Sequence, residues 1–237
     1  MQWSIITVAR GMWHVTERFL RTVQETVGRE VELIYVDNGS PDKEAWHAVS
    51  QCVVGRREFT PVKMIRFSPG VCLSKCWNSA FDIASGERIL IANNDIIFHQ
   101  LGWLEKFDEA LADPTVGVTG IVGMSWNNIP FIQGSLFAVL RNVYDLVGPF
   151  DERFEFTCED IDYSKRIQDR GYRIHMIQPE LQPDYLYHEG HATRNYYDRL
   201  AGVGSNPENT YSTFREMAHI SRLRFVYKWN LPIRIDD

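Results

Sequence analysis

The sequence lacks several features that define whole classes of protein. It has only four cysteines among 237 residues, Cys52, Cys72, Cys76 and Cys158, which are too few for a disulfide-stapled scaffold. No apolar run comes near the roughly 18 residues of a membrane-spanning helix. The opening residues also lack the basic and apolar segments of a secretory signal. We therefore expect a reduced, cytoplasmic setting.

An excess of positive charge is also missing. Lysine and arginine total 25 against 31 acidic residues, which gives a net charge of −6. A nucleic-acid backbone is not favoured by this charge, and only a local basic groove would bind one. The 44% hydrophobic and 24% charged content is that of a globular protein and excludes disorder, collagen and coiled coil. The length predicts one large domain, or one domain with an appendage.

Strands and helices are predicted to alternate through the first 95 residues. Apolar runs predict strands at 3–8, 31–36, 62–67 and 88–92. Apolar spacing and turn residues predict helices between them, one ending at Gly28 and the others at 43–54 and 71–84. This alternation predicts an α/β fold with a mainly parallel central sheet flanked by helices.

Polar residues gather where these strands end. Ligands of such sheets bind at the carboxyl ends of the strands, so these residues are candidate site residues. The polar ones are Arg10, Asp37, Asn38, Arg66, Asn93, Asn94 and Asp95, and Ala9 precedes Arg10 at the end of the first strand.

The second half has a less regular pattern. It predicts helices at 103–112, 142–147, 160–170 and 210–229, and strands at 116–121, 132–140 and 172–177. We find neither internal repeats nor linkers. A mixed half on the same sheet is therefore expected, rather than a second domain.

Two groups of residues suggest metal and acid–base chemistry. Asp95 at a strand end suits Mg²⁺ or Mn²⁺, and ligation by His188 would favour Mn²⁺. The alternatives are a turn residue or helix cap for Asp95 and a packed or surface residue for His188. The pair Glu159-Asp160 follows a Phe-rich loop, where a carboxylate is a candidate general base. Its alternative role is to favour a helix N-terminus.

Other features leave their function open. Asp37 stands where dinucleotide-binding enzymes hold a ribose, but no G-x-G-x-x-G motif follows the first strand, so a single nucleotide is the remaining reading. Aromatic residues including Trp126 offer either a stacking surface or packing. The basic residues of the last helix suit a membrane surface, an anionic acceptor or solvent. Peripheral membrane association is therefore an alternative to a freely cytoplasmic location.

The order of these segments resembles a family 2 glycosyltransferase of GT-A fold, in its rhamnosyltransferase-like subgroup. The segment 32–40 (ELIYVDNGS) resembles the nucleotide-binding segment of that family, and 90–95 (LIANND) resembles its strand ending in a D-x-D-type element. The segment 148–154 (GPFDERF), followed by Glu159-Asp160-Ile161-Asp162, resembles its GxFDExF…EDxD signature. Residues 188–193 resemble its HxxGxS segment. The resemblance covers most of residues 3–193.

The resemblance implies roles for individual residues. Asp37 would bind the nucleotide, Asp95 and His188 would hold Mn²⁺ or Mg²⁺, and Asp160 would be the general base with Glu159 beside it. Many members have Asp as the first residue of the D-x-D element, where this chain has Asn93. The loss of one negative charge implies a lower metal affinity that depends more on His188. The expected nucleotide-binding residues are Ala9, Arg10, Asp37, Asn38, Arg66, Asn78, Asn93 and Asn94, and the expected acceptor-side residues are Trp126, Gly134 and His191.

The expected function is an inverting, metal-dependent transfer of sugar from a UDP- or dTDP-linked donor to a hydroxyl acceptor. One alternative is a catalytically silent nucleotide- or sugar-binding module. Another is a sugar-1-phosphate nucleotidyltransferase, which ranks low because no Gly-rich basic loop follows the first strand. The acceptor class stays open and includes a modified nucleobase.

The expected domain organisation is one glycosyltransferase domain over residues 1–205. Within it, 1–98 would form the nucleotide-binding half and 99–205 the acceptor-side half. Residues 206–237 would form a helical extension packed on the same domain.

Overall fold

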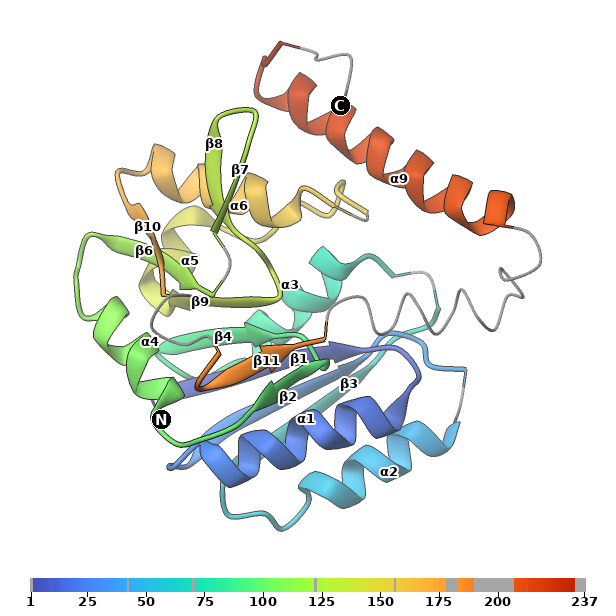
Figure 1. The fold of residues 1–237 in the computed structure, drawn as a ribbon, viewed down its shortest axis with the longest axis vertical. Helices are drawn as coiled ribbons and strands as arrows, with labels where there is room; N and C mark the ends of the chain where they lie inside the picture. The colour runs from blue at the N-terminus through green and yellow to red at the C-terminus, as the bar shows by residue number, and fades with distance from the viewer. Residues whose placement is uncertain are drawn as a thin grey trace.

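The computed structural model describes residues 2–41, 43–69, 71–121, 123–155, 157–177, 183–189 and 207–232. Strands and helices alternate through the first 92 residues, as predicted (Figure 1). These elements are β1 (Trp3–Ala9), α1 (Trp13–Thr26), β2 (Val31–Asp37), α2 (Lys43–Val53), β3 (Phe59–Arg66), α3 (Leu73–Ile83) and β4 (Arg88–Ala92).

The remaining elements are shorter and mixed. They are β5 (Ile96–Phe98), α4 (Trp103–Leu111), β6 (Val116–Gly120), β7 (Gly123–Trp126), β8 (Ile129–Ile132), β9 (Leu136–Leu140), α5 (Arg141–Val147), α6 (Glu159–Asp169), β10 (Arg173–Met176), β11 (Leu186–His188) and α9 (Pro207–Lys228).

A seven-stranded sheet forms the centre of the molecule, in the order β10-β6-β9-β4-β1-β2-β3. All neighbours are parallel except β9, which is antiparallel to both β4 and β6. This confirms the predicted α/β fold with a mainly parallel sheet. Pro61 lies in β3, where it is tolerated because β3 is the last strand in this order.

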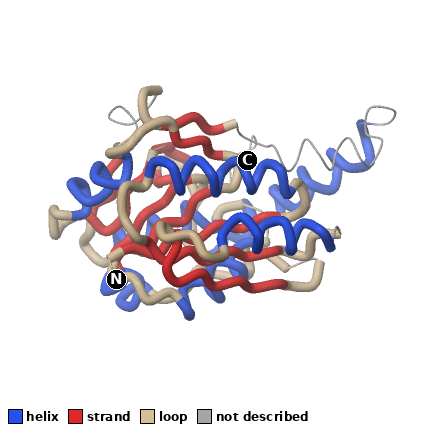
Figure 2. Tube along the Cα trace, turned by 90° about the horizontal axis from the view of Figure 1, so that it is seen from below, coloured by secondary structure: helices blue, strands red, loops and turns tan. Residues whose placement is uncertain are grey.

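Helices cover both faces of the sheet. One apolar core joins it to α1, α2 and α4, and is built on residues such as Phe19, Val49 and Phe107. The other joins it to α3, α5 and α6, with Trp77 and Tyr163 among its residues. Figure 1 shows α1 and α2 below the sheet and α5 and α6 above it. Figure 2, which is seen from below, shows helices in front of the strands. Sheets with both faces covered give the near-continuous apolar strands seen in the sequence.

The predicted strand at 132–140 is wrong in extent. The chain forms two strands there, β8 and β9, and Gln133, Gly134 and Ser135 separate them. The strand β8 pairs with β7 in a hairpin outside the main sheet. A further pair, β5 and β11, was not predicted, because strands of three residues carry too little periodicity to recognise.

The last described helix, α9, packs on the α6 side of the molecule. Phe225 is fully buried, and its ring centroid lies 5.2 Å from that of Trp126 in the β7–β8 hairpin. It shares an apolar cluster with Phe154, Cys158 and Ile161. No helix of the described residues is long and apolar enough to cross a membrane.

Candidate active site

The carboxyl ends of β1 and β2 meet in a tight turn around Asp37. The Asp37 side chain is fully buried, and its Oδ1 accepts the backbone N–H of Ser40 at 2.8 Å. The Ser40 hydroxyl in turn accepts the N–H of Gly11 at 2.6 Å. This links the loop after β1 to the loop after β2. Ser40 is a residue that the sequence analysis missed, although Asp-Asn-Gly-Ser is a turn signal.

Arg66, at the end of β3, completes this corner. Its Nε lies 3.1 Å from Asp37 Oδ2, and its Nη2 donates to the Ser40 carbonyl at 3.3 Å. Its guanidinium carbon lies 6.0 Å from the centroid of the Trp46 ring. Asn38 donates its side-chain amide to the Val71 carbonyl at 3.0 Å. The Asp37 carboxylate is thus held inside the turn, and the partly exposed groups beside it are Asn38 and Arg66.

Asp95 and His188 are brought together by the small β5–β11 sheet. Ile96 pairs with His188 in its antiparallel register, and the Asp95 carbonyl accepts the N–H of Glu189 at 3.1 Å. His188 Nε2 lies 3.1 Å from Asp95 Oδ1, although 93 positions separate the two residues. Their side chains keep 18% and 7% of their surface exposed. Both side chains are therefore mostly buried, and each keeps a small part of its surface accessible to solvent.

This pair fits a divalent cation that has few protein ligands. One carboxylate and one imidazole are donors that Mn²⁺ accepts, and Mg²⁺ sites often use one or two carboxylates with substrate phosphates. Among the described residues, no group of three or more His, Cys, Asp or Glu side chains is placed to hold a metal. Within the described part of the chain, Asp95 and His188 are thus the two side chains that could hold a cation here.

Two of the expected nucleotide-binding residues are engaged inside the protein. Asn78 accepts the N–H of Phe150 at 2.8 Å and donates to the Phe150 carbonyl at 2.9 Å. Asn94 is buried and donates to the hydroxyl of Thr16 in α1 at 2.9 Å. These hydrogen bonds support a structural role for both amides, and a nucleotide contact by either residue stays a prediction.

The other expected residues of this group remain at the strand ends. Ala9 is buried, and its carbonyl accepts the N–H of Asn38 at 2.8 Å. Arg10 is exposed in the loop that follows. Asn93 is partly buried directly after β4, two residues before Asp95. These three lie at the same edge of the sheet as Asp37.

Glu159 and Asp160 are the first two residues of α6. They therefore lie where acidic residues favour a helix N-terminus, and the same two residues are the acid–base candidates. Cys158 precedes them with a left-handed backbone, at φ 75°. Asp160 Oδ2 accepts the N–H of Gly134 at 3.0 Å, and its Oδ1 accepts the N–H of Ile161 at 2.8 Å. Glu159 is buried, and its Oε2 has no hydrogen-bond partner.

The residues between β8 and β9 connect the candidate base, Asp160, to the candidate cation site. Gly134 donates to Asp160, and the carbonyl of the next residue, Ser135, accepts the N–H of Asn93 at 2.8 Å. Gly134 is required by close approach, because a Cβ there would lie 2.6 Å from the Trp77 ring. Asp160 and the Asn93–Asp95 segment are therefore tied to one edge of the sheet through two hydrogen bonds and one peptide link.

Burial changes the acidity of both acids. It raises the pKa of Asp160, and the hydrogen bonds from Gly134 and Ile161 offset this rise only in part. Burial also raises the pKa of Glu159, and the neighbouring charge of Asp160 adds to the rise. A carboxylate with a raised pKa accepts a proton more readily, which suits a general base.

The expected acceptor-side residues have different surroundings. Gly134 contacts Asp160 directly. Trp126 packs against Phe225 of α9 and is partly buried, so packing is the role that its contacts support. His191 lies outside the described residues.

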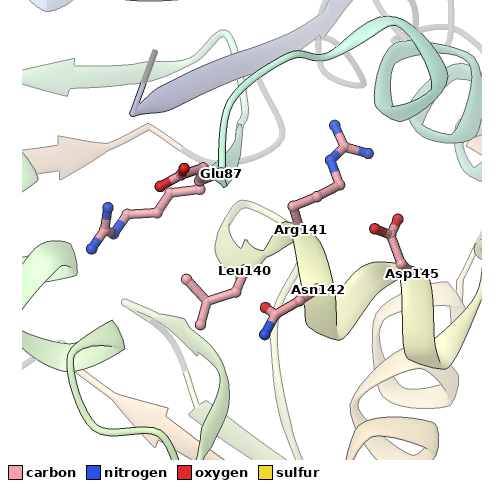
Figure 3. Close-up of a pocket in the computed structure, with 6 residues that line it drawn as sticks. Glu87, Leu140, Arg141, Asn142 and Asp145 are labelled. Carbon is pink, nitrogen blue, oxygen red and sulfur yellow. The ribbon is translucent and has the colours of Figure 1, made fainter.

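A pocket of about 380 Å³ lies at the opposite edge of the sheet, where β4 begins and β9 ends (Figure 3). Arg141 donates to the carbonyls of Phe81 and Ala84 and Arg88 pairs with Asp108, so both cations are committed within the protein. The pocket is separate from the residues described above. It is lined by Glu87, Arg88, Leu140, Arg141, Asn142 and Asp145.

Distant solved structures share this fold. A mannosyltransferase of Pyrobaculum calidifontis, in complex with GDP-Man and Mn²⁺, is 15% identical with a TM-score of 0.63, covering 96% of this chain and 87% of its own. Staphylococcus aureus TarS 1-349 with UDP is 16% identical with a TM-score of 0.61, covering 79% and 60%. GalNAc-T7 with UDP, GalNAc and Mn²⁺ is 14% identical with a TM-score of 0.64, covering 79% and 44%.

These similarities confirm the GT-A fold and, at such identities, no more than the fold. No curated protein matches the sequence significantly. The family model described as "Glycosyl transferase family 2" matches residues 4–149, which is more than half of the chain. The match includes Asp37 and Asp95 and ends before Glu159. The hypotheses for the acid pair and for His188 therefore depend on the geometry of these residues in the structure. The rhamnosyltransferase-like subgroup stays a prediction. The chain is a glycosyltransferase and belongs to glycosyltransferase family 2.

Proposed function

We propose that this glycosyltransferase is inverting and metal-dependent, and that it transfers a sugar from a nucleotide-diphosphate sugar to a hydroxyl acceptor by single displacement. Asp160 is the general base, and Asp95 with His188 holds a divalent cation. The observation that carries the proposal is the hydrogen-bonded connection Asn93–Ser135–Gly134–Asp160, because it ties base and cation site to one edge of the sheet.

The nucleotide lies at the corner formed by the ends of β1, β2 and β3. Arg66 and Asn38 are partly exposed there and offer donors to a base or ribose. Asp37 holds Arg66 in place by pairing with it, and the Val71 carbonyl holds the Asn38 amide. UDP and dTDP donors suit this corner. The UDP complexes of TarS and GalNAc-T7 support UDP, while the GDP-Man complex shows that the fold accommodates other nucleotides.

The side chains of Asp95 and His188 provide the cation's protein ligands. When bound, a Mn²⁺ or Mg²⁺ ion supplies positive charge that stabilises a leaving diphosphate. The Mn²⁺ named with two of the similar structures supports this assignment. Asn93 contributes no charge, so His188 carries more of the affinity.

Asp160 takes the proton of the acceptor hydroxyl as that oxygen attacks the anomeric carbon. Positioned general bases typically contribute about 10²–10⁴-fold to rate. The raised pKa of Asp160 and its fixed hydrogen bonds to Gly134 and Ile161 support this role. A single displacement from the face opposite the leaving group inverts the anomeric centre.

A donor screen followed by a variant tests the proposal. Nucleotide sugars are screened with Mn²⁺ by thermal shift, and the best donor is then assayed for hydrolysis and for transfer to sugar acceptors. Asp160→Asn should bind the donor normally and lose transfer by about 10²–10⁴-fold. Normal transfer by this variant would remove Asp160 as the base. Donor binding by the unaltered protein without hydrolysis or transfer would favour the silent binding module.

A further inference from the structure

We propose that Lys228, at the end of α9, is a positioning residue for Asp160. It acts through Asp162 and Asp151, which lie on either side of the acid pair in the sequence. The inference rests on the proposed function, because it needs Asp160 to be the base.

The first contact between the end of α9 and α6 is at Asp162. Its carboxylate is fully buried in α6, two residues after Asp160. Lys228 Nζ lies 2.7 Å from its Oδ1, and the indole N–H of Trp229 donates to the same oxygen at 2.9 Å. Arg166 Nε donates to Oδ2 at 3.0 Å. A buried carboxylate is tolerated only when it is compensated in this way, so Lys228 and Trp229 fix its position.

Asp151 is the second point, in the segment that leads into α6. Lys228 Nζ also lies 2.9 Å from Asp151 Oδ2, so one ammonium group joins the chain before the acid pair to the helix after it. Hydrogen bonds from Arg153 and then from Lys228 hold the pKa of the Asp151 carboxyl well below its usual range. Arg224 adds a contact nearby, donating to the Arg153 carbonyl at 2.5 Å.

Apolar packing brings α9 to these two points. Phe225 is buried in one cluster with Phe154, Cys158 and Ile161, which surround the acid pair in the sequence. The Lys228 ammonium also lies 5.4 Å from the centroids of the Phe154 and Trp229 rings. With 23% of its side chain exposed, Lys228 is a sheltered bridge rather than a surface ion pair.

This arrangement predicts an effect on turnover in particular. Without Lys228, the two carboxylates repel, and the first turn of α6 shifts relative to Gly134. The nucleotide corner lies at the ends of β1, β2 and β3, away from these contacts, so donor binding should persist. Small misplacement of a catalytic group can reduce rate by about 10²-fold.

The test compares Lys228→Met with Lys228→Arg, which keeps the charge, and Arg173→Met, which removes an exposed ion pair with Asp113. We expect Lys228→Met to lower kcat by about 10²-fold while the donor Kd changes by less than about twofold. Lys228→Arg should restore most of kcat, and Arg173→Met should match the unaltered protein. Amide hydrogen exchange in the first turn of α6 should be faster in Lys228→Met alone.

Two results would overturn the inference. One is a folded Lys228→Met variant with normal kcat, and the other is an equal loss of kcat and donor affinity. If Lys228→Met does not fold, Trp229→Phe decides, because it removes the indole N–H bond that helps Lys228 to hold Asp162, while a phenyl ring still packs against Phe225. A lowered kcat with normal donor Kd supports the inference, and a normal kcat rejects it. Activity of Asp160→Asn is measured in parallel, so that failure of the base assignment is recognised separately.

Discussion

Glu159 and Asp160 are adjacent acids with different hydrogen-bond partners. Asp160 accepts two backbone N–H groups, whereas Glu159 is buried with Oε2 unpartnered. Burial raises both pKa values, and interacting acids lose their protons in two steps that belong to the pair. Because two backbone N–H groups stabilise the Asp160 charge, we expect Asp160 to ionise at the lower pH of the two. This order separates a base from a neighbouring neutral acid.

The pH dependence of kcat/KM tests that order. Because the pKa of Asp160 is raised, activity should fall with decreasing pH at a higher value than an ordinary aspartic acid, whose pKa is about 3.9, would give. Glu159→Gln should leave this acid limb within about half a unit, because Glu159 is already neutral there. Loss of the acid limb in Glu159→Gln would instead make Glu159 the base.

His188 offers a second test at the residue scale. His188→Ala should weaken Mn²⁺-dependent donor binding by at least about tenfold, since even residues behind a metal ligand typically cost that much. Calorimetric titration of the donor with Mn²⁺ and with a chelator measures the difference. Tyr187→Phe is the control, because its side chain is exposed in the same strand. Equal weakening with and without Mn²⁺ would contradict a metal role for His188.

At the element scale, the sequence predicts the elements that neighbouring residues determine, and it does not predict contacts between residues far apart in the chain. The first four strands follow from apolar runs ended by turn residues such as Asp37 and Asn38. The break between β8 and β9 was missed because only three residues, 133–135, separate two apolar runs. Asp95 and His188 are 93 positions apart and carry no local signal of their contact. Ligand chemistry suggested their pairing and the family resemblance implied it, and the β5–β11 register supplies the structural reason.

The loop between β8 and β9 is the element on which the site geometry depends. Gly134→Ala would place a Cβ 2.6 Å from the buried Trp77 ring, so the backbone must move and its N–H must leave Asp160. Overpacking of this kind typically costs about 1–3 kcal/mol of stability. We expect kcat to fall by about 10²-fold, with little change in donor KM.

Gly86→Ala is the matched control for that variant. Its Cβ would lie 2.6 Å from the backbone nitrogen of Ser4, so it introduces similar crowding at the opposite edge of the sheet without touching α6 or the base. Thermal unfolding and steady-state kinetics should show both variants destabilised and only Gly134→Ala impaired in kcat. Equal kcat in the two variants would show that the Gly134 contact is structural alone.

At the scale of the whole molecule, the two edges of the sheet have different tasks. The carboxyl edge carries the candidate site, and the opposite edge carries a buried charge network around Glu32. Glu32 accepts the backbone N–H of Ser85 at 2.7 Å, pairs with Lys63 at 2.5 Å and accepts the Ser4 hydroxyl. These contacts join β1, β2, β3 and the segment before β4. The network lies away from the proposed chemistry and therefore concerns stability.

This network predicts how stability depends on pH. Burial alone would raise the pKa of Glu32, but the hydrogen bonds from Lys63, Ser4 and Ser85 outweigh it, so the pKa is lowered from its ordinary 4.5. The folded state therefore gains stability above about that value and loses it as pH falls through the lower, folded pKa. Glu32→Gln should cost about 2 kcal/mol near neutral pH, typical of hydrogen bonds to a charged group.

Urea unfolding from about pH 7 down to about pH 3 measures this contribution. The difference in unfolding free energy between the unaltered protein and Glu32→Gln should shrink toward the acid end, because falling pH protonates the Glu32 carboxylate. Glu30→Gln is the control, since Glu30 is exposed two residues earlier in the chain. A difference that stays constant with pH would mean that Glu32 stabilises the sheet by packing, because only the loss of its charge links the network to protons.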